Sequence, residues 1–149
     1  MVFLFIAAGV CLIDQIIKKF VETRFGDGEE RTIAGGRIRL RKVHNRGFAL
    51  GLLKERSDLV RFGTAFVTAF FGVRFLITAF GKGRKAGKAG LALLIGGGLS
   101  NLIDRLTQGS VTDYLNIRTK LPVLKKLYFN LADVMIVLGS LLVFFSKKD

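Results

Sequence analysis

The segment LYFNLADVMIVLGSLLVFF, residues 127–145, has 19 residues and a single charged side chain, Asp133. A helix needs roughly 20 apolar residues to cross the hydrocarbon core of a bilayer. This segment is therefore long enough to form a membrane span. A carboxylate within such a span is costly and usually marks a functional position.

Three more segments of the chain are apolar and nearly free of charge, at 2–17, 62–80 and 89–103. The chain has 149 residues, half of them hydrophobic, and its charges are confined mainly to the stretches between the apolar segments. This pattern predicts one integral membrane domain over residues 1–149, all-α with a small β element. With flanking residues included, we expect four transmembrane helices, at about 2–19, 60–80, 88–106 and 128–146.

The first connection, residues 20–59, contains the sequence RIRLRKVH at 37–44, in which polar and apolar residues alternate. A period of two favours a β-strand, and the Gly35-Gly36 pair before it suits a turn. We therefore expect a small sheet built from this first loop and resting on the membrane surface. We expect the connection at 107–127 to be a polar loop.

The net charge of +13 raises nucleic acid as a partner. The basic residues, however, bracket the apolar segments, and no RNA- or DNA-binding motif is present. We expect them to meet the phosphates of membrane phospholipids instead. With one cysteine and one histidine, the chain can form neither an internal disulfide nor a histidine-rich zinc site.

Four spans place the two polar connections on the same side of the membrane, and the polar residues of the spans gather near that side. Asp133 lies about six residues into the fourth span, roughly 9 Å at 1.5 Å per residue. Two acids at one depth share protons, and such a pair can activate water for hydrolysis. The residues that gather there include Asp14, Asn101, Asp104, Arg105, Asp113 and Asp133.

Structural interpretations of the same residues remain open. Asn130 and Asp133 could form the N-terminal cap of a helix. Asn101, Asp104 and Arg105 could be a polar network that holds the helices together, and Asp113 could be an ordinary turn residue. Acids inside helices would also suit a proton-coupled small membrane transporter, although we find no internal repeat of the kind common in transporters.

Five short sequence blocks stand in order along the chain. They are Asp14-Gln-Ile-Ile-Lys18, Asn45-Arg-Gly47-Phe-Ala, GGGLSNLIDRL at 96–106, Gly109-Ser-Val-Thr-Asp113-Tyr and Phe129-Asn130-Leu-Ala132-Asp133. Taken together, they resemble the lipoprotein signal peptidase (signal peptidase II) family over nearly the whole chain. The resemblance implies an intramembrane aspartyl endopeptidase that uses no metal or cofactor. Its substrates would be lipid-modified prolipoproteins, cleaved just before the diacylglyceryl-modified cysteine.

The resemblance also implies roles for particular residues. Asp113 and Asp133 match the catalytic pair of the family. The usual Val-Val-Asp-Phe of the family appears here as Val111-Thr112-Asp113-Tyr114, which changes neighbouring side chains and keeps the acid. The matched positions that bind substrate or shape the site are Asn45, Gly47, Asn101, Arg105, Asn130, Asp14, Lys18 and Asp104.

The charge distribution of the loops leaves the orientation in the membrane open, but the resemblance implies one. It places the protein in the bacterial plasma (inner) membrane as a multi-pass protein with both termini in the cytoplasm. The active site would face the extracytoplasmic leaflet, below a β-cradle in the first loop. We expect a monomer.

Overall fold

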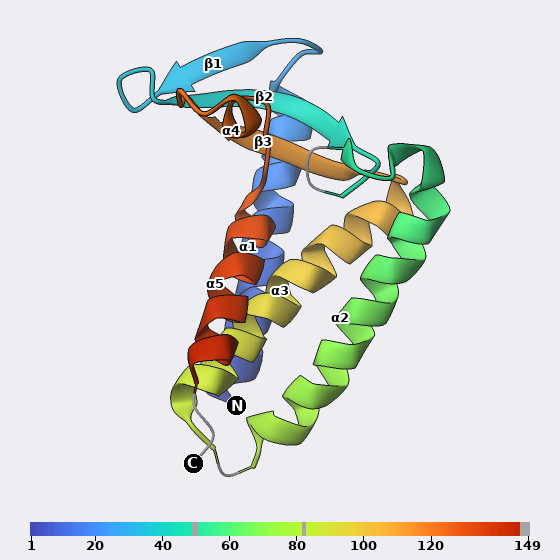
Figure 1. The fold of residues 1–149 in the computed structure, drawn as a ribbon, viewed down its shortest axis with the longest axis vertical. Helices are drawn as coiled ribbons and strands as arrows, with labels where there is room; N and C mark the ends of the chain where they lie inside the picture. The colour runs from blue at the N-terminus through green and yellow to red at the C-terminus, as the bar shows by residue number, and fades with distance from the viewer. Residues whose placement is uncertain (49–50, 82, 147–149) are drawn as a thin grey trace.

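The computed structural model describes residues 1–48, 51–81 and 83–146. The C-terminal residue, part of the expectation that both termini are cytoplasmic, lies outside these ranges. The long helices lie alongside one another, the sheet lies across one end of them, and the N-terminus is at the other end (Figure 1). The elements are α1 (Val2–Arg24), β1 (Glu30–Ile33), β2 (Ile38–Asn45), the short η2 (Lys54–Arg56), α2 (Ser57–Ala79), α3 (Lys85–Thr107), β3 (Val111–Ile117), α4 (Pro122–Lys125) and α5 (Leu131–Phe145).

The predicted strand is confirmed as β2, which lies in the middle of an antiparallel sheet of order β1-β2-β3. The expectation that the first loop alone builds the sheet is wrong. The third strand, β3, comes from the second connection, which we expected to be a loop. Most of β3 is buried, and Val21 of α1 and Phe25, which follows the helix, pack against its Tyr114. Pairing between segments so far apart leaves no local sequence pattern.

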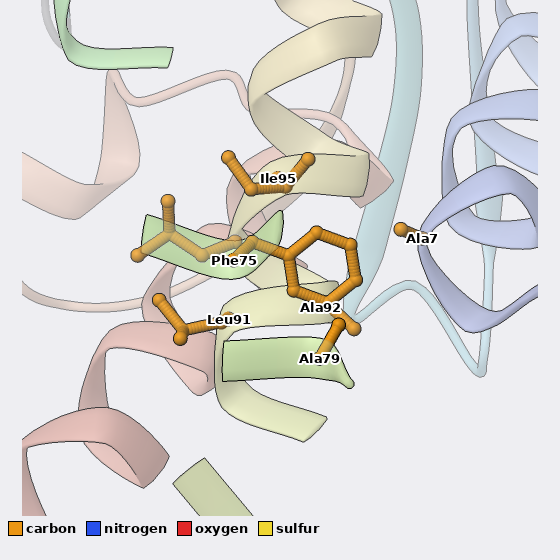
Figure 2. Close-up of a cluster of buried hydrophobic side chains, with 7 residues drawn as sticks. Ala7, Phe75, Ala79, Leu91, Ala92 and Ile95 are labelled. Carbon is orange, nitrogen blue, oxygen red and sulfur yellow. The ribbon is translucent and has the colours of Figure 1, made fainter. Parts of the chain in front are cut away.

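The centre of the bundle is α3, which packs against α1, α2 and α5. Its Leu91, Ala92 and Ile95 meet Ala7 of α1 and side chains of α2 in one apolar cluster (Figure 2). Small side chains at this contact allow the helix backbones to approach closely, as is common in membrane proteins. The cluster holds the helices together at the end away from the sheet.

The outward faces of the helices are strongly apolar. On α2, Phe66 is 74% exposed and Ile77 is 72% exposed, and a soluble protein rarely leaves such a surface in water. Two helical segments, Lys54–Ala79 and Lys85–Thr107, are long and apolar enough to cross a membrane, whereas Leu131–Phe145 is a shorter apolar helix. These faces suit hydrocarbon, and the arrangement of four spans stays a prediction.

Several helix boundaries differ from the expected ones, and for two of them the contacts give the reason. α5 begins at Leu131 rather than near residue 128, because Phe129 is still extended and pairs with Leu115 in an isolated β-bridge. α1 continues to Arg24 rather than ending near residue 19, since its last turns pack against the sheet.

Glycine is required where α3 meets α5. A Cβ on Gly97 would lie 2.5 Å from the carbonyl oxygen of Ala132, and one on Gly139 would lie 2.5 Å from that of Gly90. Carbon and oxygen atoms do not approach so closely without displacing one backbone. The glycine at 97 therefore permits the close packing of α3 against α5.

We predict that Gly97→Ala destabilises the protein by roughly 1–3 kcal/mol, as overpacking of a tight contact does. Gly9→Ala in α1 is the matched control, because a Cβ there would meet no atom within 4 Å. Thermal unfolding in detergent measures the difference between the two variants. Equal melting temperatures would contradict the close contact between α3 and α5.

Candidate active site

The site begins at Asn130, the fully buried N-cap of α5. Its Oδ1 accepts a hydrogen bond from the backbone N–H of Asp133 at 2.9 Å, and Asp133 Oδ2 accepts from the backbone N–H of Asn130 at 3.1 Å. The capping interpretation of these residues is therefore confirmed. Asp133 lies in the first turn of α5, not six residues inside a span, because the helix begins later than expected.

Asp113 approaches Asn130 from the sheet. It lies in β3, opposite Val43 of β2, so the interpretation of Asp113 as a turn residue is wrong. Its Oδ1 accepts a hydrogen bond from Asn130 Nδ2 at 2.8 Å, and its Oδ2 accepts from Asn45 Nδ2 at 3.0 Å. Asn130 thus contacts both acids, one through its side-chain amide and the other through its backbone and amide oxygen.

Asn101 of α3 orients the second acid. Its Nδ2 donates to Asp133 Oδ1 at 2.9 Å, while its Oδ1 accepts from Lys18 Nζ at 2.9 Å and from Asn130 Nδ2 at 3.2 Å. Because Oδ1 of Asn101 accepts both of these hydrogen bonds, its Nδ2 must face the carboxylate of Asp133. Each of the two acids therefore has its position set by amide donors.

Behind these residues lies a buried cluster of charges. Lys18 is 3% exposed, and its Nζ lies 2.8 Å from Asp14 Oδ2 and 3.0 Å from Asp104 Oδ2. Asp14 Oδ1 accepts from the backbone N–H of Ala132, and Asp104 Oδ2 accepts from that of Thr112, each at 3.1 Å. The cluster therefore joins α1 and α3 to the two segments that carry Asp113 and Asp133.

Arg105 is 8% exposed and contacts the first loop rather than its neighbour Asp104. Its Nη2 donates to the carbonyl oxygen of Gly47 at 3.0 Å, and its Nη1 lies 3.5 Å from that of Asn101. The interpretation of Arg105 as part of a structural network with Asp104 needs correction, since Lys18 is the ion-pair partner of Asp104 among the residues that the structure describes. Arg105 Nε is buried and has no hydrogen-bond partner within these residues.

Gly47 is held close to the backbone of the following turn. Its N–H donates to Asn45 Oδ1 at 3.0 Å, and a Cβ at this position would lie 2.3 Å from the carbonyl oxygen of Leu52. Asn45 Nδ2 also donates to Asp113, so the side chain of Asn45 connects the turn to the acid. A larger residue at 47 would displace this turn from the site.

Burial raises the pKa of Asp113 to about 7, and the negative charge of nearby Asp133 adds to this shift. The amide hydrogen bonds from Asn45 and Asn130 act in the opposite direction. Asp113 therefore keeps its proton near neutral pH more readily than an ordinary aspartate. An acid that holds a proton next to a second carboxyl is suited to general acid and base chemistry.

Asp113 borders an open cleft of about 740 Å³, which lies between the sheet and the segments around η2 and α4. Within the described part of the chain, no group of three or more His, Cys, Asp or Glu side chains is placed to hold a metal ion. The cleft is lined by Val43, His44, Asn45, Arg46, Gly51, Lys54, Glu55, Asp113, Pro122, Lys126 and Tyr128.

The structure thus brings together all ten residues singled out in the sequence. It adds four polar residues that the sequence analysis did not select. Ser100 and Tyr114 hydrogen-bond to Asp14, and Gln15 Nε2 donates to Asp104 Oδ1 at 2.8 Å. Gln15, Ser100, Thr112 and Tyr114 all stand inside the five blocks, next to or one residue from a selected position, and that adjacency is the signal that could have found them.

Comparison with known proteins identifies the family. The family described as Signal peptidase (SPase) II matches residues 6–147. A lipoprotein signal peptidase of Moorella thermoacetica is 38% identical over 146 residues, which cover 95% of this chain and 89% of that protein. One of Clostridioides difficile is 33% identical over 142 residues, which cover 92% of this chain and 91% of that protein.

The fold is also similar to that of solved structures. A bacterial membrane enzyme determined by the in meso method at 2.3 Å superposes with a TM-score of 0.79, at 22% identity, covering 96% of this chain and 85% of the other. A second, determined at 1.9 Å, gives a TM-score of 0.76 at 22% identity, covering 96% of this chain and 90% of the other. Because the family match spans most of the chain and the relatives exceed 30% identity over nearly all of it, the chain belongs to the signal peptidase II family of proteases.

Proposed function

We propose that this protein is an aspartyl endopeptidase that removes signal peptides from prolipoproteins, cutting just before the diacylglyceryl-modified cysteine. The observation that carries the proposal is the pair of buried carboxyls, Asp113 and Asp133, joined through Asn130. The names of the relatives support the same substrate class. Among the described residues that line the cleft with Asp113, no serine or cysteine accompanies His44.

In the proposed reaction, Asp113 and Asp133 share one proton. The ionised carboxylate takes a proton from water, and the resulting hydroxide attacks the carbonyl carbon before the modified cysteine. The protonated carboxyl donates a hydrogen bond to the carbonyl oxygen, where negative charge develops. When the C–N bond breaks, a carboxyl returns a proton to the leaving amine, so that one water is consumed and the pair regains its starting charge.

The asparagines and Arg105 would prepare this pair for the reaction. Amide donors from Asn45, Asn101 and Asn130 keep each carboxyl in one orientation, so little reorganisation is needed as charge moves. Arg105 holds the carbonyl oxygen of Gly47 and so positions the turn that also carries Asn45. We assign substrate contacts to this turn, and scaffold roles to Asp14, Lys18 and Asp104.

We further propose that α1, α2, α3 and α5 cross the bacterial plasma membrane, with both termini in the cytoplasm and phospholipids around the helices. The sheet would lie as a cradle on the extracytoplasmic side, above the acids. The exposed apolar faces of the helices, with the sheet at one end of them (Figure 1), support the crossing of the membrane. The assignment of the cytoplasmic side follows from the resemblance to the family. A proton-coupled transporter would need acids along a path through the helices, whereas Asp113 borders an open cleft at the sheet end.

Asp113→Asn and Asp133→Asn should each lower cleavage by roughly 10²–10⁴-fold, the usual contribution of a general acid or base. An amide keeps the size of the side chain but cannot take a proton from water. The assay follows cleavage of a lipid-modified prolipoprotein by purified enzyme in detergent. Asp27→Asn is the control, because its side chain is 97% exposed. Full turnover by either variant of the pair would remove the assignment.

Arg105→Lys should lower cleavage about ten-fold or more while the protein still folds. Lysine keeps the charge but loses the planar fork that reaches Gly47 and Asn101 together. Cleavage rate and melting temperature are compared with those of Arg41→Lys, an exposed arginine on β2. A rate close to that of the wild type would leave Arg105 without a role in positioning the loop.

The raised pKa of Asp113, about 7, predicts two effects of pH. Activity should fall about ten-fold per unit above pH 7, because the pair loses the proton that the reaction needs.

The same pKa predicts an effect on stability. Between about pH 4 and 7, Asp113 keeps a proton in the folded state that it has released in the unfolded state. Its contribution to the free energy of unfolding therefore falls as the pH rises through that window. Melting temperatures from pH 4 to 8 should therefore decline less for Asp113→Asn than for the wild type, and parallel curves would contradict the shifted pKa.

A further inference from the structure

The cleft beside Asp113 carries an excess of positive charge. Arg46, Lys54 and Lys126 line it, against Glu55 and Asp113. Lys54 lies 3.9 Å from Glu55, a loose and exposed ion pair. Among the residues that the structure describes, Arg46 and Lys126 have no carboxylate within ion-pair distance. These two cations are free to meet an anionic group that enters the cleft.

Both cations sit on backbone that is held in place. Arg46 lies between Asn45 and Gly47, which are joined by the hydrogen bond from Gly47 N–H to Asn45 Oδ1. On the other wall, fully buried Asn116 donates to the carbonyl oxygens of Lys125 and Leu127, at 3.1 and 2.7 Å, on either side of Lys126. The backbone positions from which the two charged side chains project are therefore determined by the fold, and the side chains themselves are exposed.

The chemistry of the substrate leaves one segment for these charges to bind. The diacylglyceryl group on the cysteine is uncharged, and the signal peptide that precedes it is apolar and belongs to the membrane. The cleft lies at the sheet end of the molecule, away from the apolar surfaces of the helices. The part of the substrate on that side is the mature segment that follows the modified cysteine.

We infer that this cleft binds the first residues after the modified cysteine and favours acidic ones among them, with Arg46 and Lys126 as the residues that determine this preference. The inference rests on the proposed function. Opposite charges at these exposed positions attract one another weakly and are screened by salt. The preference should thus be modest and should decline as ionic strength rises.

The test uses three synthetic substrates that differ only at the two positions after the diacylglyceryl-modified cysteine, Asp-Asp, Ser-Ser or Lys-Lys. In uncharged detergent at low ionic strength, kcat/KM of the wild type should be roughly ten-fold higher for Asp-Asp than for Lys-Lys, as several exposed ion pairs would give. Arg46→Glu and Lys126→Glu should each reduce that ratio by roughly three-fold or more. Arg41→Glu is the matched control: it reverses the same charge on β2, the strand that leads to Arg46, but lies outside the cleft, and it should leave the ratio unchanged.

Three results would overturn the inference. They are equal kcat/KM for all three substrates, an equal change in the Arg41→Glu control, and rates that depend on added phosphatidylglycerol through Arg46 and Lys126 but not on substrate charge. The last would make the cleft a site for lipid headgroups.

Binding of the cleaved product, the diacylglyceryl-cysteine peptide with Asp-Asp or Lys-Lys, separates this inference from the proposed function. Fluorescence anisotropy would measure that binding to the wild type and the variants. Selective binding without cleavage would refute the peptidase proposal and support the cleft assignment. Cleavage without selective binding would support the peptidase proposal and refute the cleft assignment.

Discussion

The buried ion cluster around Lys18 is the interaction on which the rest of the structure depends. One ammonium lies between the carboxylates of Asp14 and Asp104, and all three side chains are at most 5% exposed. Removing one member would leave a buried charge without compensation, which typically costs about 3–5 kcal/mol. The two carboxylates also accept backbone N–H groups from α5 and β3. A single cluster therefore sets the positions of four elements relative to one another.

Asn101 and Asn130 connect this cluster to the two acids of the site and orient them. Lys18 also donates to Asn101 Oδ1, so the cluster determines which way that amide faces. Asn101 in turn orients Asp133, and Asn130 joins Asp133 to Asp113. Neutral amides suit this role, because they hold two acids without adding a positive charge that would keep both of them ionised.

The molecule separates its surfaces by chemistry along its length. Apolar side chains cover the outer faces of the helices, and the buried charged groups gather at the sheet end. Under the proposed function, this division would suit the two parts of an amphiphilic substrate. The apolar part would approach through the bilayer, while the peptide that follows it would reach a cleft with cations on its walls.

The sequence by itself determined the long helices, the strand predicted at 37–44 and the identity of the clustered acids, and it offered the cap at Asn130 as one interpretation. Each of these depends on local periodicity, on short-range capping or on the cost of a charge in an apolar segment, and all of these can be read from neighbouring residues. Only the tertiary structure decided that residues 111–117 form a strand, that Asp133 stands in the first turn of α5, and that Lys18 rather than Arg105 pairs with Asp104. These features arise from contacts between segments up to about a hundred residues apart. Nothing in the local sequence shows which distant segment a polar group will meet, because that depends on how the helices pack.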